Sequence, residues 1–63
     1  MCQINDIVQI KSPLMAYPTM GMVISLSPIR VKLKGGAIFT LVSDKGVTVL
    51  RPDLQELFRN DFE

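Results

Sequence analysis

Three basic side chains alternate with apolar ones near the middle of this 63-residue chain. Arg30, Lys32 and Lys34 occupy every second position, so a strand would present all three cations on one face, about 7 Å apart. That spacing suits contacts with the phosphates of a nucleic-acid strand. Aromatic residues that could stack on bases make up only 6% of the chain, and its net charge is only +1.

We therefore prefer a structural interpretation of this basic row, either a solvated face or edge lysines that deter aggregation. Binding of nucleic acid or of a phosphate ligand, with Lys45 as a further contact, is the alternative.

An uncharged apolar segment separates the first two expected strands. Pro13 and Pro18 mark residues 12–20 as a loop, and its candidate protein-binding side chains are Leu14, Met15, Tyr17 and Met20. A lid over the core is the commoner role for such a loop. The alternative is a binding surface, because methionines adapt their shape and tyrosine combines an apolar ring with a polar hydroxyl.

Residue types that perform catalysis or bind metals are scarce. The chain has no histidine, and Cys2 is its only cysteine, so it contains no intramolecular disulfide and no set of zinc or iron ligands. Its serines and threonines have no supporting base. Gly35-Gly36 lacks the following Lys-Ser/Thr of a phosphate-binding loop. We expect neither an enzyme nor a bound metal or cofactor.

Length and composition predict one small domain, residues 1–63, with more apolar surface than its core can hold. A chain of this length buries only about 60% of its unfolded surface, and 48% of the residues are apolar. Contiguous apolar surface that stays exposed usually marks a contact site. Residues 1–51 carry six bases and two acids, net +4, whereas residues 52–63 carry one base and four acids, net −3. The acidic end can neutralise the basic body.

No targeting or membrane segment is recognisable. Every apolar run is shorter than the roughly 18–20 residues of a membrane span, and residues 1–6 lack the regions of a signal peptide. We expect a cytoplasmic protein with a reduced thiol.

Alternating apolar residues predict five short strands. The expected ranges are 4–11, 21–27, 29–34, 38–43 and 47–51. The second strand is expected to place residues 22, 24 and 26 on one face, with a bulge or bend at Gly21. In the third, Ile29, Val31 and Leu33 form the buried face.

Glycines and prolines predict the connections and the end of the chain. Gly35-Gly36 predicts a two-residue hairpin turn, and residues 44–46 predict a second hairpin turn with Gly46 in a left-handed conformation. Pro52 and Asp53 begin a short helix. Its apolar face is expected to hold Leu54, Leu57 and Phe58. Residues 1–3 and 60–63 are expected to fray.

Five short strands, a long first connection, tight later hairpins and a terminal helical turn indicate an all-β fold, a small five-stranded SH3-like barrel. An open five-stranded sheet backed by the C-terminal helix is the alternative. An OB-fold fits less well, because its strands are longer and it usually carries a helix between its third and fourth strands.

The opening of the chain resembles two groups of small β proteins. Residues 6–12, Asp-Ile-Val-Gln-Ile-Lys-Ser, followed by Pro18-Thr19-Met20 and Val23, resemble the start of the bacterial YodC-like proteins. A longer apolar loop replaces their glycine turn, and residues 31–34 replace their Trp-Phe pair. With Gly21 before Val23, the opening is also similar to KOW and Tudor-like barrels, many of which bind nucleic acid, ribosomes or RNA polymerase. Both resemblances imply a small barrel.

These observations favour a non-enzymatic interaction module that binds protein, either a second copy or a larger assembly, through exposed apolar surface. Such a chain also suits an accessory or regulatory protein, including a phage-type inhibitor that docks on a host machine. Nucleic-acid or phosphate binding through the basic strand is the alternative function, and no membrane partner is expected.

Overall fold

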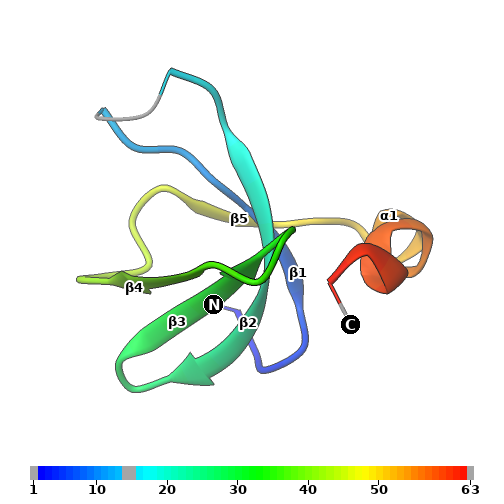
Figure 1. Cartoon of the computed structure of the whole chain (residues 1–63), viewed down its shortest axis with the longest axis horizontal. Helices are drawn as coiled ribbons and strands as arrows, with labels where there is room; N and C mark the ends of the chain where they lie inside the picture. The colour runs from blue at the N-terminus through cyan, green and yellow to red at the C-terminus, as the bar shows by residue number, and fades with distance from the viewer. Residues whose placement is uncertain (1, 14–15, 63) are drawn as a thin grey trace.

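Five strands and one short helix form the fold in a computed structural model, which describes residues 2–13 and 16–62. The elements are β1 (Ile7–Ile10), β2 (Thr19–Leu26), β3 (Ile29–Leu33), β4 (Ile38–Leu41), β5 (Val47–Val49), α1 (Pro52–Phe58) and the 3₁₀ helix η1 (Arg59–Asp61). All strand pairs are antiparallel, in the order β4-β3-β2-β1-β5 (Figure 1). The five predicted strands and the C-terminal helix are therefore confirmed.

The sheet is open, because β4 and β5 form its two edges and do not pair with each other. The closed SH3-like barrel is thus not shown. β2 is the longest strand: residues 19–22 pair with β1, and residues 21–26 pair with β3. Residues 42–46 cross from one edge of the sheet to the other, so the second predicted hairpin is wrong. Gly46 nevertheless has the expected positive φ, 86°.

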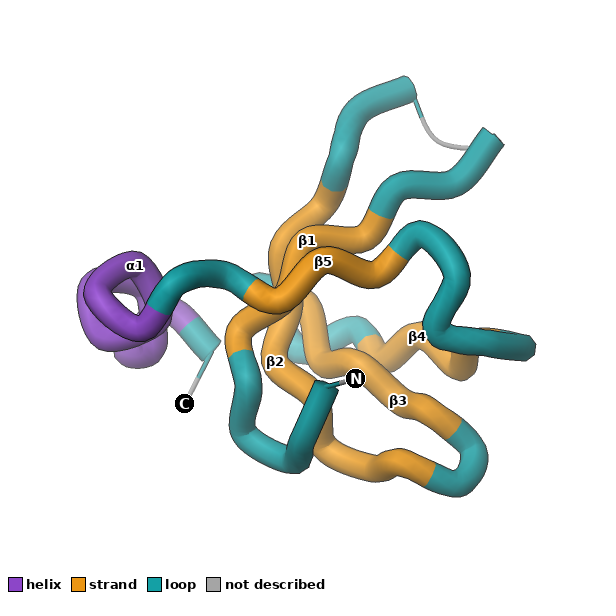
Figure 2. Tube along the Cα trace, turned by 180° about the vertical axis from the view of Figure 1, so that it is seen from behind, coloured by secondary structure: helices purple, strands orange, loops and turns teal. Residues whose placement is uncertain are grey.

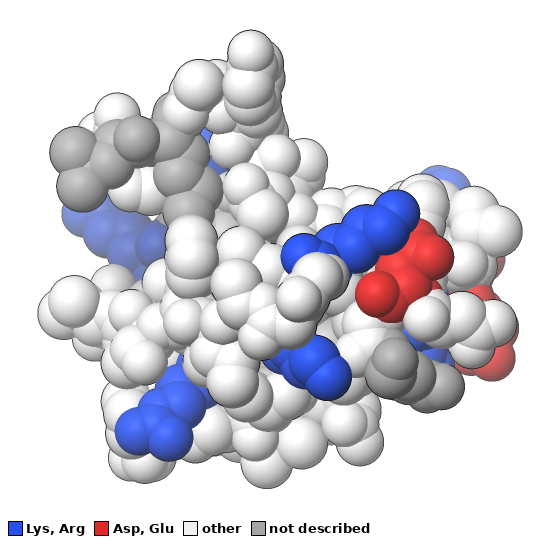
Figure 3. Space-filling view, in the orientation of Figure 1, with Lys and Arg blue, Asp and Glu red and all other residues white. Residues whose placement is uncertain are grey.

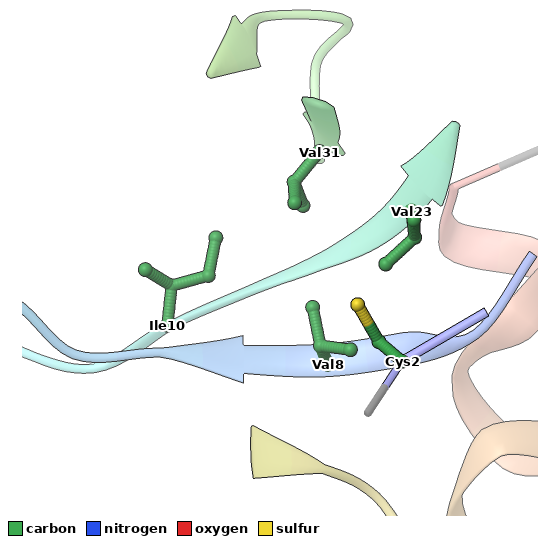
Figure 4. Close-up of a cluster of buried hydrophobic side chains, with 5 residues drawn as sticks. All are labelled: Cys2, Val8, Ile10, Val23 and Val31. Atoms are coloured by element: carbon green, nitrogen blue, oxygen red, sulfur yellow. The ribbon is translucent and has the colours of Figure 1, made fainter. Parts of the chain in front are cut away.

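The main core lies on one face of this sheet. Val8 and Ile10 of β1 point toward Val23 of β2 and Val31 of β3, and Cys2 packs beside them (Figure 4). The buried face predicted for β3 is confirmed, since Val31 is fully buried and residues 29 and 33 pack around the cluster. Cys2 lies in the range expected to fray, yet its thiol is buried.

β1 is shorter than predicted because a turn precedes it. Residues 4–5 form this turn, in which Asn5 has a φ of 75°. The Asn5 N–H donates to the Val23 carbonyl at 2.8 Å, and the Val23 N–H donates to the Asp6 carbonyl at 2.9 Å. The turn thereby holds the N-terminal segment against β2.

β2 departs from the predicted alternation at residue 24. Its register with β3 shifts between Val23 and Ser25, so Ile24 is the extra residue of a bulge. Before the shift Met22 pairs with Lys32, and after it Leu26 pairs with Ile29 on the core face. The prediction that residues 22, 24 and 26 share one face is therefore wrong.

Gly21 serves close packing and is not the site of the bulge. It is buried opposite Leu33 of β3, and a Cβ atom there would clash with Val31 Cγ1 and lie 2.9 Å from the Lys32 carbonyl oxygen. We expect Gly21→Ala to lower the free energy of unfolding by about 1–3 kcal/mol through overpacking. Urea denaturation would measure this loss. Thr48→Ala, at an exposed site on β5, is the control, and equal stability of the two variants would contradict the packing argument.

The β3–β4 hairpin loop has three residues instead of the predicted two. The Leu33 N–H donates to the Ala37 carbonyl at 2.7 Å, which leaves residues 34–36 as the loop. Gly35 and Gly36 both have a φ of 96°, a conformation that glycine adopts without steric cost. The predicted positive φ is confirmed, and only the loop length is wrong.

α1 lies beside the sheet (Figures 1 and 2). Pro52 begins the helix and Asp53 lies in its first turn, as predicted. Leu54 and Phe58 are half-buried, but Leu57 is 69% exposed. The three residues share one helical face as predicted, but only part of that face is covered. Phe62, which follows η1, is 3% exposed. Across residues 2–13 and 16–62, no helix has the length and apolar character that crossing a membrane requires.

Gln55 fastens α1 to the sheet. Its Oε1 accepts a hydrogen bond from the Ile7 N–H at 3.3 Å, and its Nε2 donates to the Leu50 carbonyl at 2.8 Å. The Leu50 N–H donates to the Ile7 carbonyl at 3.1 Å. The side-chain amide of Gln55 thus extends the hydrogen-bond ladder between β1 and β5. Nearby, Arg59 Nη1 donates to the Asn5 carbonyl at 2.8 Å.

Gln55→Ala would leave the N–H of Ile7 without this acceptor, and Ile7 is fully buried. We expect a loss of about 1–3 kcal/mol in the free energy of unfolding, measured by thermal and urea denaturation. Glu56→Ala, an exposed position on the same helix, should cost much less. Since alanine is a better helix former than either residue, similar losses in both variants would contradict the role assigned to the Ile7 hydrogen bond.

Candidate protein-binding surface

Large apolar side chains remain exposed in several parts of the described chain. They are Ile4, Tyr17, Leu26, Ile38, Phe39, Val42, Val49 and Leu57. Three of these eight lie in β4 or directly after it, and none of the four β4 residues is buried. β4 is therefore the element where exposed apolar side chains concentrate.

The outer edge of β4 presents backbone groups as well as side chains. In an antiparallel ladder, residues that bond to the same neighbour recur at every second position. Since Ala37 bonds to Leu33 of β3, Phe39 and Leu41 also face β3. Ile38 and Thr40 then direct their N–H and C=O groups away from the sheet. Such a row is a template for pairing with another strand.

Residues 35–43, here called the uncharged edge, contain no charged residue. Proteins commonly protect exposed edge strands with lysine, proline or a bulge. The uncharged edge has neither lysine nor proline, and its strand residues, Ile38–Leu41, pair with β3 without a bulge. Sequence reasoning missed this surface because a closed barrel would have covered the edge. The absence of charge across nine residues was the feature that could have revealed it.

The predicted protein-binding loop is described only in part, since Leu14 and Met15 lie outside the described residues. Tyr17 is 79% exposed, and the described parts of the loop project away from the sheet (Figures 1 and 2). The role of a lid stays a prediction, because residues 14–15 are not among those parts. Met20 is half-buried in β2, opposite Gln9.

Tyr17 and Met20 border an open groove of about 610 Å³. Its other walls include Leu33 at the end of β3 and Phe58 and Phe62 from the C-terminal segment. The sequence did not predict this meeting of residues, because it depends on where α1 docks. The groove is a second apolar surface, separate from the uncharged edge.

The predicted nucleic-acid-binding residues differ in exposure and in their place in the fold. Arg30 and Lys34 are exposed, whereas Lys32 is half-buried between its cross-strand neighbours Met22 and Ile38. Lys45 lies in the β4–β5 connection. On the face in Figure 3, basic side chains are separated by uncharged surface, and acidic side chains gather over α1.

Within the described ranges, no group of three or more His, Cys, Asp or Glu side chains is placed to hold a metal ion. The described residues offer surfaces for contact: the uncharged edge, the Tyr17 groove and separate cations. A comparison with known proteins finds no matching family, no matching curated protein and no matching solved structure.

Proposed function

We propose that this chain is a non-enzymatic interaction module that binds protein through the uncharged edge. The observation that carries the proposal is the combination of outward backbone groups with exposed apolar side chains on one strand. Ile38 is 54% exposed and Val42 is fully exposed. A polypeptide strand can satisfy both features together, because strand addition supplies main-chain hydrogen bonds and side-chain contacts at alternate positions.

The total surface of the chain supports this proposal. Its accessible area is 4537 Å², whereas a compact monomer of its mass, 7.0 kDa, is expected to expose about 4,000 Å². The excess fits a small domain whose surface is incompletely covered by its own chain. A binding partner would cover more of it.

We also propose that the open five-stranded sheet is an opened SH3-like barrel. β5 returns to pair with β1, so the first and last strands lie together, and the sheet encloses a core on one face. Closure would require β4 to meet the opposite edge. The same opening leaves the uncharged edge available to a partner.

Nucleic-acid binding has less physical support. Lys11 and Lys45 line a groove with residues 40–43 of the uncharged edge, but a single-strand binding groove combines such cations with several stacking aromatics. The groove that gathers aromatic residues is a different one, and there Phe62 is buried, Phe58 is half-buried, and Asp61 lies in the lining together with Lys34. The cations that the sequence grouped together differ in exposure and position.

Cross-linking followed by affinity capture, in the cells that produce the protein, tests the proposal. Wild type is compared with Ile38→Lys, which places a charge on the uncharged edge. Thr48→Lys, which charges the opposite edge strand at an exposed residue, is the matched control. We expect wild type and Thr48→Lys to capture the same protein, and Ile38→Lys to lose it. Equal capture by all three would overturn the assignment to this edge.

A fluorescence-anisotropy titration with single- and double-stranded oligonucleotides tests the alternative. We expect no binding at low salt. Binding that falls steeply as salt is added, and that a Lys32→Glu/Lys34→Glu variant loses, would favour nucleic acid instead.

A further inference from the structure

We propose that the partner of the uncharged edge is a second copy of this chain, paired antiparallel through β4 with Thr40 opposite its own counterpart. This inference rests on the proposed function, because it uses the same edge. It adds the identity of the partner and the register of the pairing. The product would be a two-fold symmetric dimer with one sheet continuous across both copies.

The register follows from the backbone directions. A residue pair that exchanges hydrogen bonds across a two-fold axis must direct its N–H and C=O groups outward in both copies. Thr40 does so and is the central residue of the segment 37–43. Ile38 also directs its N–H and C=O groups outward. It lies opposite Val42 of the second copy when the two-fold axis passes between the two Thr40 residues. Pairing therefore uses the backbone groups that β3 leaves free.

The side chains are self-complementary in this register. Within β4, Thr40 meets Thr40 and Phe39 meets Leu41. Extension of the pairing beyond the strand would bring Val42 opposite Ile38 and Ser43 opposite Ala37, both pairs of similar size. Aromatic, aliphatic and threonine pairs of these kinds stabilise antiparallel sheets. A foreign strand would have to supply such a sequence, whereas the chain itself already contains it.

The same pairing covers the most exposed apolar side chains of the edge. Val42, which lies in a bend directly after β4, would come opposite Ile38 of the other copy, and both side chains are exposed in the monomer. Phe39, which lies opposite Val31 on the core face, gains Leu41 of the second copy as a neighbour. Apolar surface is thus removed from water on both faces of the new strand pair.

Electrostatic repulsion does not oppose the dimer along the paired segment. No charged residue lies between Lys34 and Asp44, so no like charges are directly opposite. Arg30 pairs with Thr40 on the outer face, which puts the two Arg30 strands three strand spacings apart, about 14 Å. This exceeds the screening length of about 8 Å at physiological ionic strength.

Sedimentation equilibrium of the whole chain tests the dimer. We expect the mass to rise with concentration from 7.0 kDa toward twice that value, and Thr40→Pro to stay monomeric. Proline there removes the outward N–H without removing a bond to β3, and edge strands tolerate such a proline. Thr40→Ala, which keeps the N–H, should still dimerise. A wild-type monomer at every concentration up to about the millimolar range would overturn the inference, since edge pairing gives a small interface of weak affinity.

Oxidative trapping tests the register without the Thr40→Pro variant. Circular dichroism would check separately that Thr40→Pro folds. In a Thr40→Cys variant the two introduced thiols, one from each copy, would meet on the axis within disulfide range. This variant should therefore form covalent dimers much faster than Thr48→Cys on the other edge. The wild-type protein is the control for disulfide formation through Cys2, which is buried. Equal trapping at both positions would overturn the proposed pairing.

The outcomes also separate this inference from the proposed function. Suppose wild type is monomeric but captures a different protein that Ile38→Lys loses. The second copy is then excluded, and the edge remains a binding site. If wild type shows no self-association and captures no protein, both proposals are rejected.

Discussion

Phe62→Ala is expected to unfold much of the chain at room temperature. Phe62 is nearly completely buried although it is the last residue that the structure describes. Truncating a buried phenylalanine costs about 3–5 kcal/mol, and a domain of this size seldom has more than about 3–5 kcal/mol in total. The loss should appear in circular dichroism as a lower melting temperature and a large unfolded fraction before heating.

Leu57→Ala is the control for that experiment. Leu57 lies in the same C-terminal segment but is mostly exposed, so its truncation should change stability by no more than about 0.5 kcal/mol. If Phe62→Ala were as stable as Leu57→Ala, the segment after α1 would not contribute to the packed fold.

Ile7→Ala is expected to cost about 2–5 kcal/mol in the free energy of unfolding. Ile7 is fully buried, yet it is opposite Met22 and lies outside the main core cluster. Its burial arises on the face of β1 opposite Val8, near the helix that Gln55 anchors. Truncation there would leave a cavity between β1 and its covering segment. Urea denaturation would report the loss.

Ile4→Ala offers a matched comparison, because it removes the same atoms from a side chain that is 54% exposed. We expect the Ile7 variant to lose several times more stability than the Ile4 variant. Equal losses would mean that β1 is packed on only one face.

Local patterns predicted the elements well. Alternation located all five strands, and Pro52 located the start of α1. The bulge escaped prediction because Val23, Ile24 and Ser25 carry no mark of which residue is extra. The exposure of Leu57 escaped it because helical spacing shows which residues share a face, not how much of that face the sheet covers. Closure of the sheet depends on contacts between its two edges, which no local pattern specifies.

The candidate site was harder to predict than the fold. Tyr17, a predicted protein-binding residue, is exposed, but the groove that it borders also takes Phe58 and Phe62 from the other end of the chain. The basic row was visible as a strand pattern, yet its members differ in burial once β2 and β4 flank them. The uncharged edge was present in the sequence, but its meaning depends on β4 being at the edge of an open sheet.

Amide hydrogen exchange can detect, residue by residue, the proposed binding of a protein strand to the free edge of β4. We expect the Phe39 and Leu41 amides, which face β3, to exchange slowly at every concentration. The Thr40 amide should exchange quickly in dilute protein and become protected as concentration rises or when a captured partner is added. A Thr40 amide that stays fast under all these conditions, beside protected neighbours, would contradict the claim.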